Sequence, residues 1–307
     1  MTKNYRYFLY SIFLCFTLAY NLPTFCFSLT QWFSNLFSDK KIEQMTREFP
    51  AQEHIEIEIN NTNGSTTVTT WKQESISFEA VKKASEKEID NISVEVEMDD
   101  NLLFATTKFA TPKTKGQVDF NLIVPEQTTI KLIQNKNGKI TIKNVAGDIN
   151  VQTDNGAIDI SNTTKNVQAK TDNGKITIKN ANGDIDVKTD NGIIDISDTT
   201  KNVRAKTDNG AIKAAIKQFK NDAHYELVTK NGKILLFAPK DINANIVAHV
   251  KNGSIISEHE ISLAEYTMEI NKKTLDQLRK NIQGTIGDGG GKILLKSGNG
   301  IIKILQT

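Results

Sequence analysis

Residues 137–174 read NGKITIKNVAGDINVQTDNGAIDISNTTKNVQAKTDNG, and this stretch decides the fold. It opens on an Asn-Gly dipeptide that recurs every 18 residues, with its glycine at Gly138, Gly156, Gly174, Gly192 and Gly210. Segments 138–173 and 174–209 differ at only seven of 36 positions, which indicates a recent internal duplication. A fixed period of this length is typical of architectures in which similar units stack on one another.

Each unit contains two short runs of alternating apolar and polar residues. With glycine counted as position 1, positions 3 and 5 are isoleucine in four units, from Ile140 and Ile142 to Ile194 and Ile196. Positions 12 and 14 are Ile, Val or Ala, as in Ile149 and Val151. A period of two predicts half-buried strands, so each unit predicts two strands.

The Asn-Gly dipeptides predict a tight turn at one corner of every unit, because glycine and asparagine tolerate the positive φ angles that such turns require. A looser corner near residues 145–148 closes the other end. The residues expected at the tight corners are Asn137, Gly138, Asn155, Gly156, Asn173, Gly174, Asn191, Gly192, Asn209 and Gly210.

Two architectures fit the repeat: a β-solenoid whose coils stack in parallel, and an antiparallel β-meander whose hairpins turn at Asn-Gly. A meander leaves one apolar face uncovered unless another layer exists, and no strongly apolar layer is evident. We therefore predict an all-β fold, a single-stranded β-helix-like solenoid with coils of about 18–22 residues. A hexapeptide-type left-handed helix is excluded, because positions 11 and 17 are Asp or Asn.

The chain divides into three parts on its pattern. The alternating runs begin after His54, so we expect the solenoid domain over 54–307, with its most regular repeats at 138–209. Residues 1–28 are interpreted as a secretory signal: Lys3 and Arg6 precede an apolar run too short to span a bilayer. Cleavage after Ser28 is preferred over an uncleaved anchor, which would hold the protein at the membrane.

Removal of residues 1–28 would also remove both cysteines, Cys15 and Cys26, and two of the 38 basic residues. The remaining 36 basic and 36 acidic residues cancel, so the charge does not indicate a nucleic-acid partner. The mature chain would have no cysteine for a disulfide, a thiolate metal site or a nucleophile.

The segment 29–53 differs from the rest. Its apolar residues fall at helical spacing and predict an amphipathic helix over 29–49: Leu29, Trp32, Phe33, Leu36 and Phe37. Such a helix could lie on a membrane surface. A cap over the open end of the solenoid is the alternative, which we prefer.

Residues that could carry chemistry are few. Position 17 forms a column of carboxylates, and the weak candidates for a metal site are Asp154, Asp172, Asp190 and Asp208. Lysines at position 15 would neutralise them, so we predict no metal and no cofactor.

The threonines at position 16 form a single rank, which favours the edge of the core over an ice-binding surface. The glycines before Lys292 do not have phosphate-loop spacing. Glu258, His259 and Glu260 lack a second metal ligand at a diagnostic spacing, so we expect them to be polar residues exposed at the surface. No catalytic residues are identified.

The order of these segments resembles the toast-rack putative adhesins of bacterial envelopes. The resemblance rests on IEIEINNTNGSTTVTTWKQESISFEAV, then VDFNLIVPEQTTIKL, the NGKITIKNVAGDINVQTDNG copies, and GTIGDGGGKILLKSGNGIIKIL at the end. It implies a β-helix-like stack that is exported or faces the cell exterior, with an adhesive or envelope role and no catalytic residues.

We therefore expect a non-enzymatic protein of the periplasm, cell surface or extracellular space that binds an envelope or surface ligand, either protein or glycan. One alternative is a polysaccharide-active enzyme on a β-helix scaffold, which would need clustered carboxylates. Another is a self-assembling architectural protein. A functional surface is expected first in the irregular coils after Gly210, where the spacing loosens.

Overall fold

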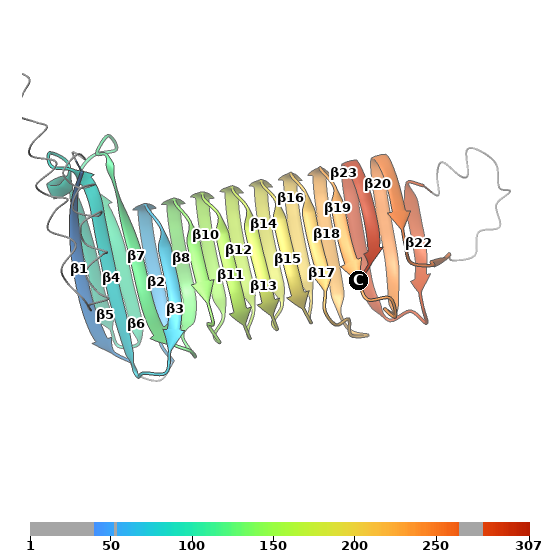
Figure 1. The fold of residues 1–307 in the computed structure, drawn as a ribbon, viewed down its shortest axis with the longest axis horizontal. Helices are drawn as coiled ribbons and strands as arrows, with labels where there is room; N and C mark the ends of the chain where they lie inside the picture. Colours follow the sequence, from blue (N-terminus) through green and yellow to red (C-terminus); the bar gives the residue numbers. More distant parts are fainter. Residues whose placement is uncertain (1–39, 52–53, 264–278) are drawn as a thin grey trace, which may run out of the picture. The chain divides into compact units, whose positions relative to one another are not determined.

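The protein is a stack of parallel coils whose strands form two opposed faces. The computed structural model describes residues 40–51, 54–263 and 279–307, and residues 42–307 form one compact unit. Each regular coil places one strand on the first face, turns at an Asn-Gly corner, and places one strand on the second face (Figure 1). The described strands join into one 23-stranded hydrogen-bonded sheet, since β20 and β23 run through both faces.

The first face is a run of strands that pair mostly in parallel. In spatial order these strands are β5 (Ile92–Asp99), β6 (Leu102–Phe109), β2 (Glu56–Asn63), β8 (Thr129–Asn137), β10 (Ile149–Asn155), β12 (Val167–Asn173), β14 (Ile185–Asn191), β16 (Val203–Asn209), β18 (His224–Asn231), the first half of β23 (Gly291–Gln306), the first half of β20 (Ala244–Ser257), β22 (Asn281–Ile286) and β21 (Ser262–Leu263).

The second face carries the other strand of each coil. Its order is β1 (Lys40–Pro50), β4 (Ser75–Ser85), β7 (Gly116–Pro125), β3 (Thr66–Trp71), β9 (Ile140–Lys143), β11 (Ile158–Thr163), β13 (Ile176–Ala181), β15 (Ile194–Thr199), β17 (Ile212–Ile216), β19 (Ile234–Ala238), and the second halves of β23 and β20.

The register places the same repeat position of successive coils side by side. On the first face Ile149 pairs with Val167, which pairs with Ile185, and the strands are parallel throughout this region. The predicted solenoid is therefore confirmed, and an antiparallel meander is excluded for the repeats.

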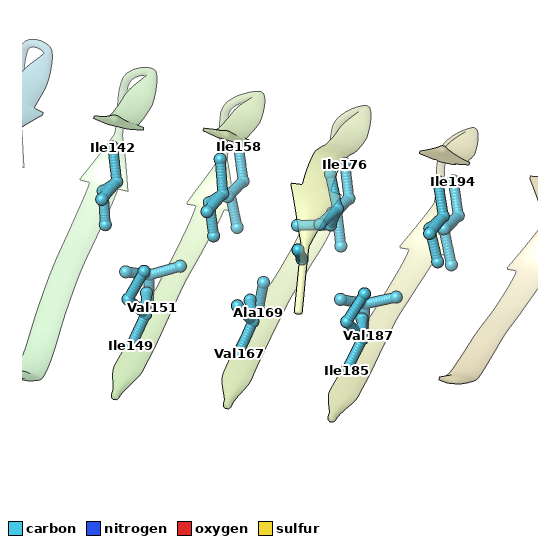
Figure 2. Close-up of a cluster of buried hydrophobic side chains, with 14 of the residues drawn as sticks. Ile142, Ile149, Val151, Ile158, Val167, Ala169, Ile176, Ile185, Val187 and Ile194 are labelled. Carbon is cyan, nitrogen blue, oxygen red and sulfur yellow. The ribbon is translucent and has the colours of Figure 1, made fainter. Parts of the chain in front are cut away.

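Columns of inward-facing side chains fill the space between the two faces. Ile158, Ile176 and Ile194 extend from the second face toward Val151 and Val187 on the first (Figure 2). All five are at most 1% exposed. Full burial of one such side chain stabilises the fold by roughly 1.5–3 kcal/mol, so each coil gains by stacking on the next.

Both ends of the stack depart from chain order. Near the N-terminal end, β2 lies between β6 and β8, although β6 follows it by some 40 residues in the sequence. At the other end, the last strand, β23, lies between β18 and β20. Antiparallel strands then border the parallel stack, with β5 on β6, β4 on β7 and β22 on β20. This arrangement pairs edges that would otherwise remain open.

Two local predictions differ from the structure. Part of the segment expected to be helical, residues 40–50, is strand β1, which pairs with β4; the apolar residues that suggested the helix lie outside the described residues. The high charge of residues 82–90 by itself predicts a loop, but Lys82–Ser85 belong to β4 and a short 3₁₀ helix, η1 (Ile89–Asn91), follows. In both cases pairing with a neighbouring strand overrides the local sequence preference.

Candidate functional site

Asparagines at the tight corners form a continuous ladder of side-chain amides. The Nδ2 group of Asn155 donates to Oδ1 of Asn137 at 3.0 Å, and Asn173 donates to Asn155 at the same distance. Eight such bonds connect nine residues in the order Asn63, Asn137, Asn155, Asn173, Asn191, Asn209, Asn231, Asn299 and Asn252. All of the donors point toward the preceding coil of the stack, so the corner is a structural hydrogen-bond network.

Glycine is needed at these corners for space more than for its backbone angles. A Cβ atom on Gly174 would lie 1.9 Å from the carbonyl oxygen of Gly156, and Gly192 has the same contact with Gly174. The expected positive φ occurs at Gly138 (144°) and Gly210 (156°), but Gly156, Gly174 and Gly192 are outside that region. Close approach of successive coils therefore accounts for the glycines in the most regular repeats.

The threonines at position 16 point into the core. Thr171 is fully buried, and its hydroxyl donates to the carbonyl oxygen of Gly156 at 3.0 Å. Thr153, Thr189, Thr207 and Thr229 repeat this bond to the preceding corner. These side chains lie at the edge of the core, as predicted, and cannot present a flat surface to ice.

The carboxylate column at position 17 lies beside lysines. Asp172 is 3.7 Å from the Lys170 ammonium, Asp190 is 3.2 Å from Lys188, and Asp208 is 2.5 Å from Lys230. Within the residues that the structure describes, no three His, Cys, Asp or Glu side chains gather closely enough to hold a metal ion. The absence of a bound metal ion stays a prediction.

The outer surface of the first face is hollowed across five strands, β10 to β18. Two shallow depressions there share Gln168, Asp186 and Arg204, and together we name them the polar groove. Its outward-facing lining consists of Asn150, Gln152, Asn166, Gln168, Lys170, Asp184, Asp186, Lys188, Asn202, Arg204, Lys206, His224 and Glu226. No aromatic side chain other than His224 lines it, so its chemistry is that of amides and charges.

The charges in the polar groove are paired with one another across neighbouring coils. Arg204 lies 3.6 Å from Asp186 on one side and 3.3 Å from Glu226 on the other. Lys206 also contacts Glu226, at 2.8 Å. The hydrogen bond from Lys206, helped by the nearby positive charges, lowers the pKa of Glu226 below its usual value despite partial burial. Glu226 therefore stays ionised and holds Arg204 and Lys206 in place.

Of two other regions considered in the sequence, one differs from its prediction and one agrees with it. His259 was expected at the surface but is only 5% exposed, while Glu258 and Glu260 beside it are exposed. The glycine-rich segment before β23 is a tight turn, as expected, with positive φ at Gly287, Gly289 and Gly290. Neither region brings together groups that would act in catalysis.

Most of the polar groove lies outside the positions that the sequence singled out. Those candidates were at positions 15 and 17, whereas Gln168, Asp186 and Arg204 face outward in register at position 13. The available signal was the alternation itself, because position 13 lies between the buried positions 12 and 14. The groove also lies mainly on the regular coils, whereas a functional surface was expected after Gly210.

A stack of parallel coils with amide ladders along its corners and a polar outer surface defines a β-solenoid. The model of the family described as Toastrack DUF4097 matches residues 54–305, so the chain belongs to the toast-rack family. A comparison with curated proteins finds no match. None of the helices in the described residues is long and apolar enough to cross a lipid bilayer.

Several solved structures match most of this chain at low sequence identity. A "putative adhesin" from Bacteroides fragilis is 12% identical, with a TM-score of 0.46 and coverage of 86% of this chain and 97% of that one. A "putative cell adhesion protein" from Clostridium sporogenes is 11% identical (TM-score 0.30, 87% and 100% covered). A "putative lipid binding protein" from Parabacteroides distasonis is 9% identical (TM-score 0.24, 85% and 96% covered).

Proposed function

We propose that this chain is a non-enzymatic, adhesin-like binding protein of the cell envelope or cell surface, and that the polar groove is its ligand-binding surface. The observation that carries the proposal is the repetition of outward amide and charged side chains from coil to coil along the groove. Strands of neighbouring coils are about 4.8 Å apart, so similar groups recur at a fixed spacing.

An extended polymer with repeated polar groups is the ligand that such a surface fits. Amide side chains both donate and accept hydrogen bonds, and the paired Arg204 and Lys206 can exchange one partner for a ligand oxygen. Each contact would be weak because the surface is shallow and wet. Repetition would raise the overall affinity through multivalency, so long glycans or repetitive surface polymers are preferred over small molecules.

The test is binding of the purified full chain to a glycan array and to isolated envelope polysaccharides. Gln168→Ala with Arg204→Ala alters the groove on β12 and β16, the strands on either side of β14, and we expect at least a tenfold loss of affinity. Thr177→Ala with Lys179→Ala is the matched control, because it also removes one polar and one basic side chain, here from the outer surface of β13 on the second face. Equal binding by both variants, or no ligand on any array, would contradict the proposal.

A polysaccharide-active enzyme is the competing outcome of the same experiment. The groove contains Asp184, Asp186 and Glu226, but Asp186 is paired with Arg204, and Glu226 is paired with Arg204 and Lys206. The pKa of Glu226 is lowered, whereas a general acid needs a raised one. Release of reducing sugar, with or without calcium, would overturn the non-enzymatic assignment, especially if Asp172→Asn abolished it.

Export completes the proposal, because an adhesin-like protein must reach a surface. We infer that residues 1–28 act as a secretory signal cleaved after Ser28, and that the mature chain faces the periplasm or exterior. Fractionation of the native cell with N-terminal sequencing tests this inference. A protein that keeps Met1 and stays in the cytosolic fraction would contradict it.

A further inference from the structure

The second face changes its chemistry in the last coils of the stack. On the regular strands β11, β13 and β15 the outward residues are Asp159, Ser161, Thr177, Lys179, Asp195 and Ser197. On β17, β19 and the second halves of β23 and β20 the corresponding positions become mostly apolar. The apolar outward residues there are Ala215, Leu235, Phe237, Ile256, Ile301 and Leu305.

Strand register makes these residues one continuous surface. Ala215 pairs with Phe237, which pairs with Leu305, so three apolar side chains lie in one row. In the adjacent row Leu235 lies between two lysines and Ile256 ends the row. Ile256 and Ile301 are 47% and 41% exposed, which is unusual for isoleucine on a folded domain.

Lysines are interleaved with the apolar residues. Lys213 and Lys303 occupy the row of Leu235, and Lys233 lies at the start of β19. The Lys213 ammonium lies 5.4 Å from the centre of the Phe237 ring. No Asp or Glu occurs on β17, on β19 or in residues 301–306, and no ion pair to these lysines is found within the described part of the chain. Lysines are therefore the charged residues within the surface, while Asp195 on β15 and Glu258, just after β20, lie at its edges.

We propose that this surface, the basic apolar face (Lys213, Ala215, Lys233, Leu235, Phe237, Ile256, Ile301, Lys303 and Leu305), docks on the anionic surface of a lipid bilayer. The isoleucines, leucines and Phe237 would enter the boundary between head groups and acyl chains, and the lysines would contact lipid phosphates. Lysines among exposed apolar residues complement this occupant, because anionic head groups attract the ammonium groups and the acyl boundary accepts the apolar side chains.

Lipid docking is independent of the polar groove. The groove lies on the outer surface of the first face, whereas the basic apolar face lies on the outer surface of the second. A chain held on a membrane by its second face would leave the groove open to solvent and to a polymer. Variants that lose glycan binding should therefore still dock on lipid, and variants that lose lipid docking should still bind glycan.

The first experiment locates the contact on the molecule. The full chain with Phe237→Trp is mixed with vesicles of phosphatidylcholine and phosphatidylglycerol that carry brominated acyl chains. We expect the fraction of tryptophan fluorescence that is quenched to be more than twice that of the wild type, which contains only Trp32 and Trp71. Thr141→Trp, on the outer surface of β9, is the control. Quenching at position 237 no greater than at 141 would overturn the proposal, even if residues 1–39 hold the chain on the vesicle.

The second experiment tests charge. Each lysine near an anionic surface strengthens binding about fivefold, so Lys213→Gln with Lys303→Gln should weaken binding to phosphatidylglycerol vesicles roughly 25-fold at low salt. Lys143→Gln with Lys179→Gln removes the same charge from the same face within the regular coils. An equal loss of vesicle affinity in the two double variants would show that the face does not recognise anionic lipid. Wild-type binding to vesicles of phosphatidylcholine alone that is as strong as binding to phosphatidylglycerol vesicles would show the same.

Discussion

At the scale of single residues, asparagine can donate a side-chain N–H at a left-handed corner position, which aspartate cannot do. A second amide ladder runs along the opposite corner, where Asn162 donates to Asn144 at 2.9 Å and Asn180 donates to Asn162 at 3.0 Å. All three residues have φ between 52° and 63°, a left-handed conformation that asparagine tolerates better than most residues. The next coil has Asp198 in the same conformation (58°), and a carboxylate has no N–H to donate to Asn180.

Asp198→Asn should therefore extend the second ladder by one hydrogen bond. We expect the free energy of unfolding to rise by about 0.5–1 kcal/mol, the usual net value of one such bond. Urea unfolding of the full chain followed by circular dichroism measures it. Asp154→Asn removes the same charge from an exposed column without adding a ladder bond, and an equal gain there would attribute the effect to charge alone.

At the scale of the strand, one large residue replaces the small apolar ones in the inward column. Tyr225 on β18 lies in register with Val203 and is fully buried, with its ring centre 5.4 Å from that of Phe219. Its hydroxyl is 2.7 Å from the Thr199 hydroxyl, so the one polar atom it brings into the core has a partner. Burial raises the pKa of Tyr225 to about 12.

This pKa predicts loss of stability in alkali. The unfolded tyrosine ionises near pH 10 and the folded one only near 12, so the stabilisation is complete below pH 10 and is lost as the pH rises to 12. The full loss is about 2–3 kcal/mol at 1.36 kcal/mol per unit. Denaturant midpoints from pH 9 to 12 should fall more steeply for the wild type than for Tyr225→Phe. Parallel curves would mean that the buried hydroxyl does not control the transition.

At the scale of the whole molecule, inserted strands close the ends of the stack. β23 is the last strand of the chain, yet it supplies the parallel partner for β18 and β19 on one side and for β20 on the other. In repeat proteins each unit contacts only its neighbours, so the loss of one coil should affect the adjacent coils first. The last residues therefore control one end of the solenoid without touching its centre.

Deletion of residues 291–307 tests this arrangement. We expect amide hydrogens of β18, β19 and β20 to exchange at least tenfold faster, because their shared partner is gone, while β12 and β14 stay protected. Hydrogen exchange with mass spectrometry of the full and truncated chains measures both regions in one sample, and the central strands are the internal control. Unchanged protection of β20 would contradict the role given to β23.

The repeat alone determined which side chains face inward and where the tight corners lie, and with no further apolar layer in the sequence it favoured parallel stacking of equivalent positions. A period of 18 with alternating Ile and Val leaves few other ways to bury every coil, as the register of Ile149, Val167 and Ile185 confirms. The outward columns that line the groove follow from the same alternation, so Gln168, Asp186 and Arg204 could have been found.

Only the tertiary structure decided the ends and the contacts between coils. The strand at 40–50, the placement of β2 and β23 out of chain order, and the burial of His259 depend on segments far apart in the sequence. Local pattern fixes which face of a strand is apolar, but not which open edge that strand will pair with. Even the glycines of the repeat are explained by the neighbouring coil, whose carbonyl oxygen occupies the space that a Cβ atom would need.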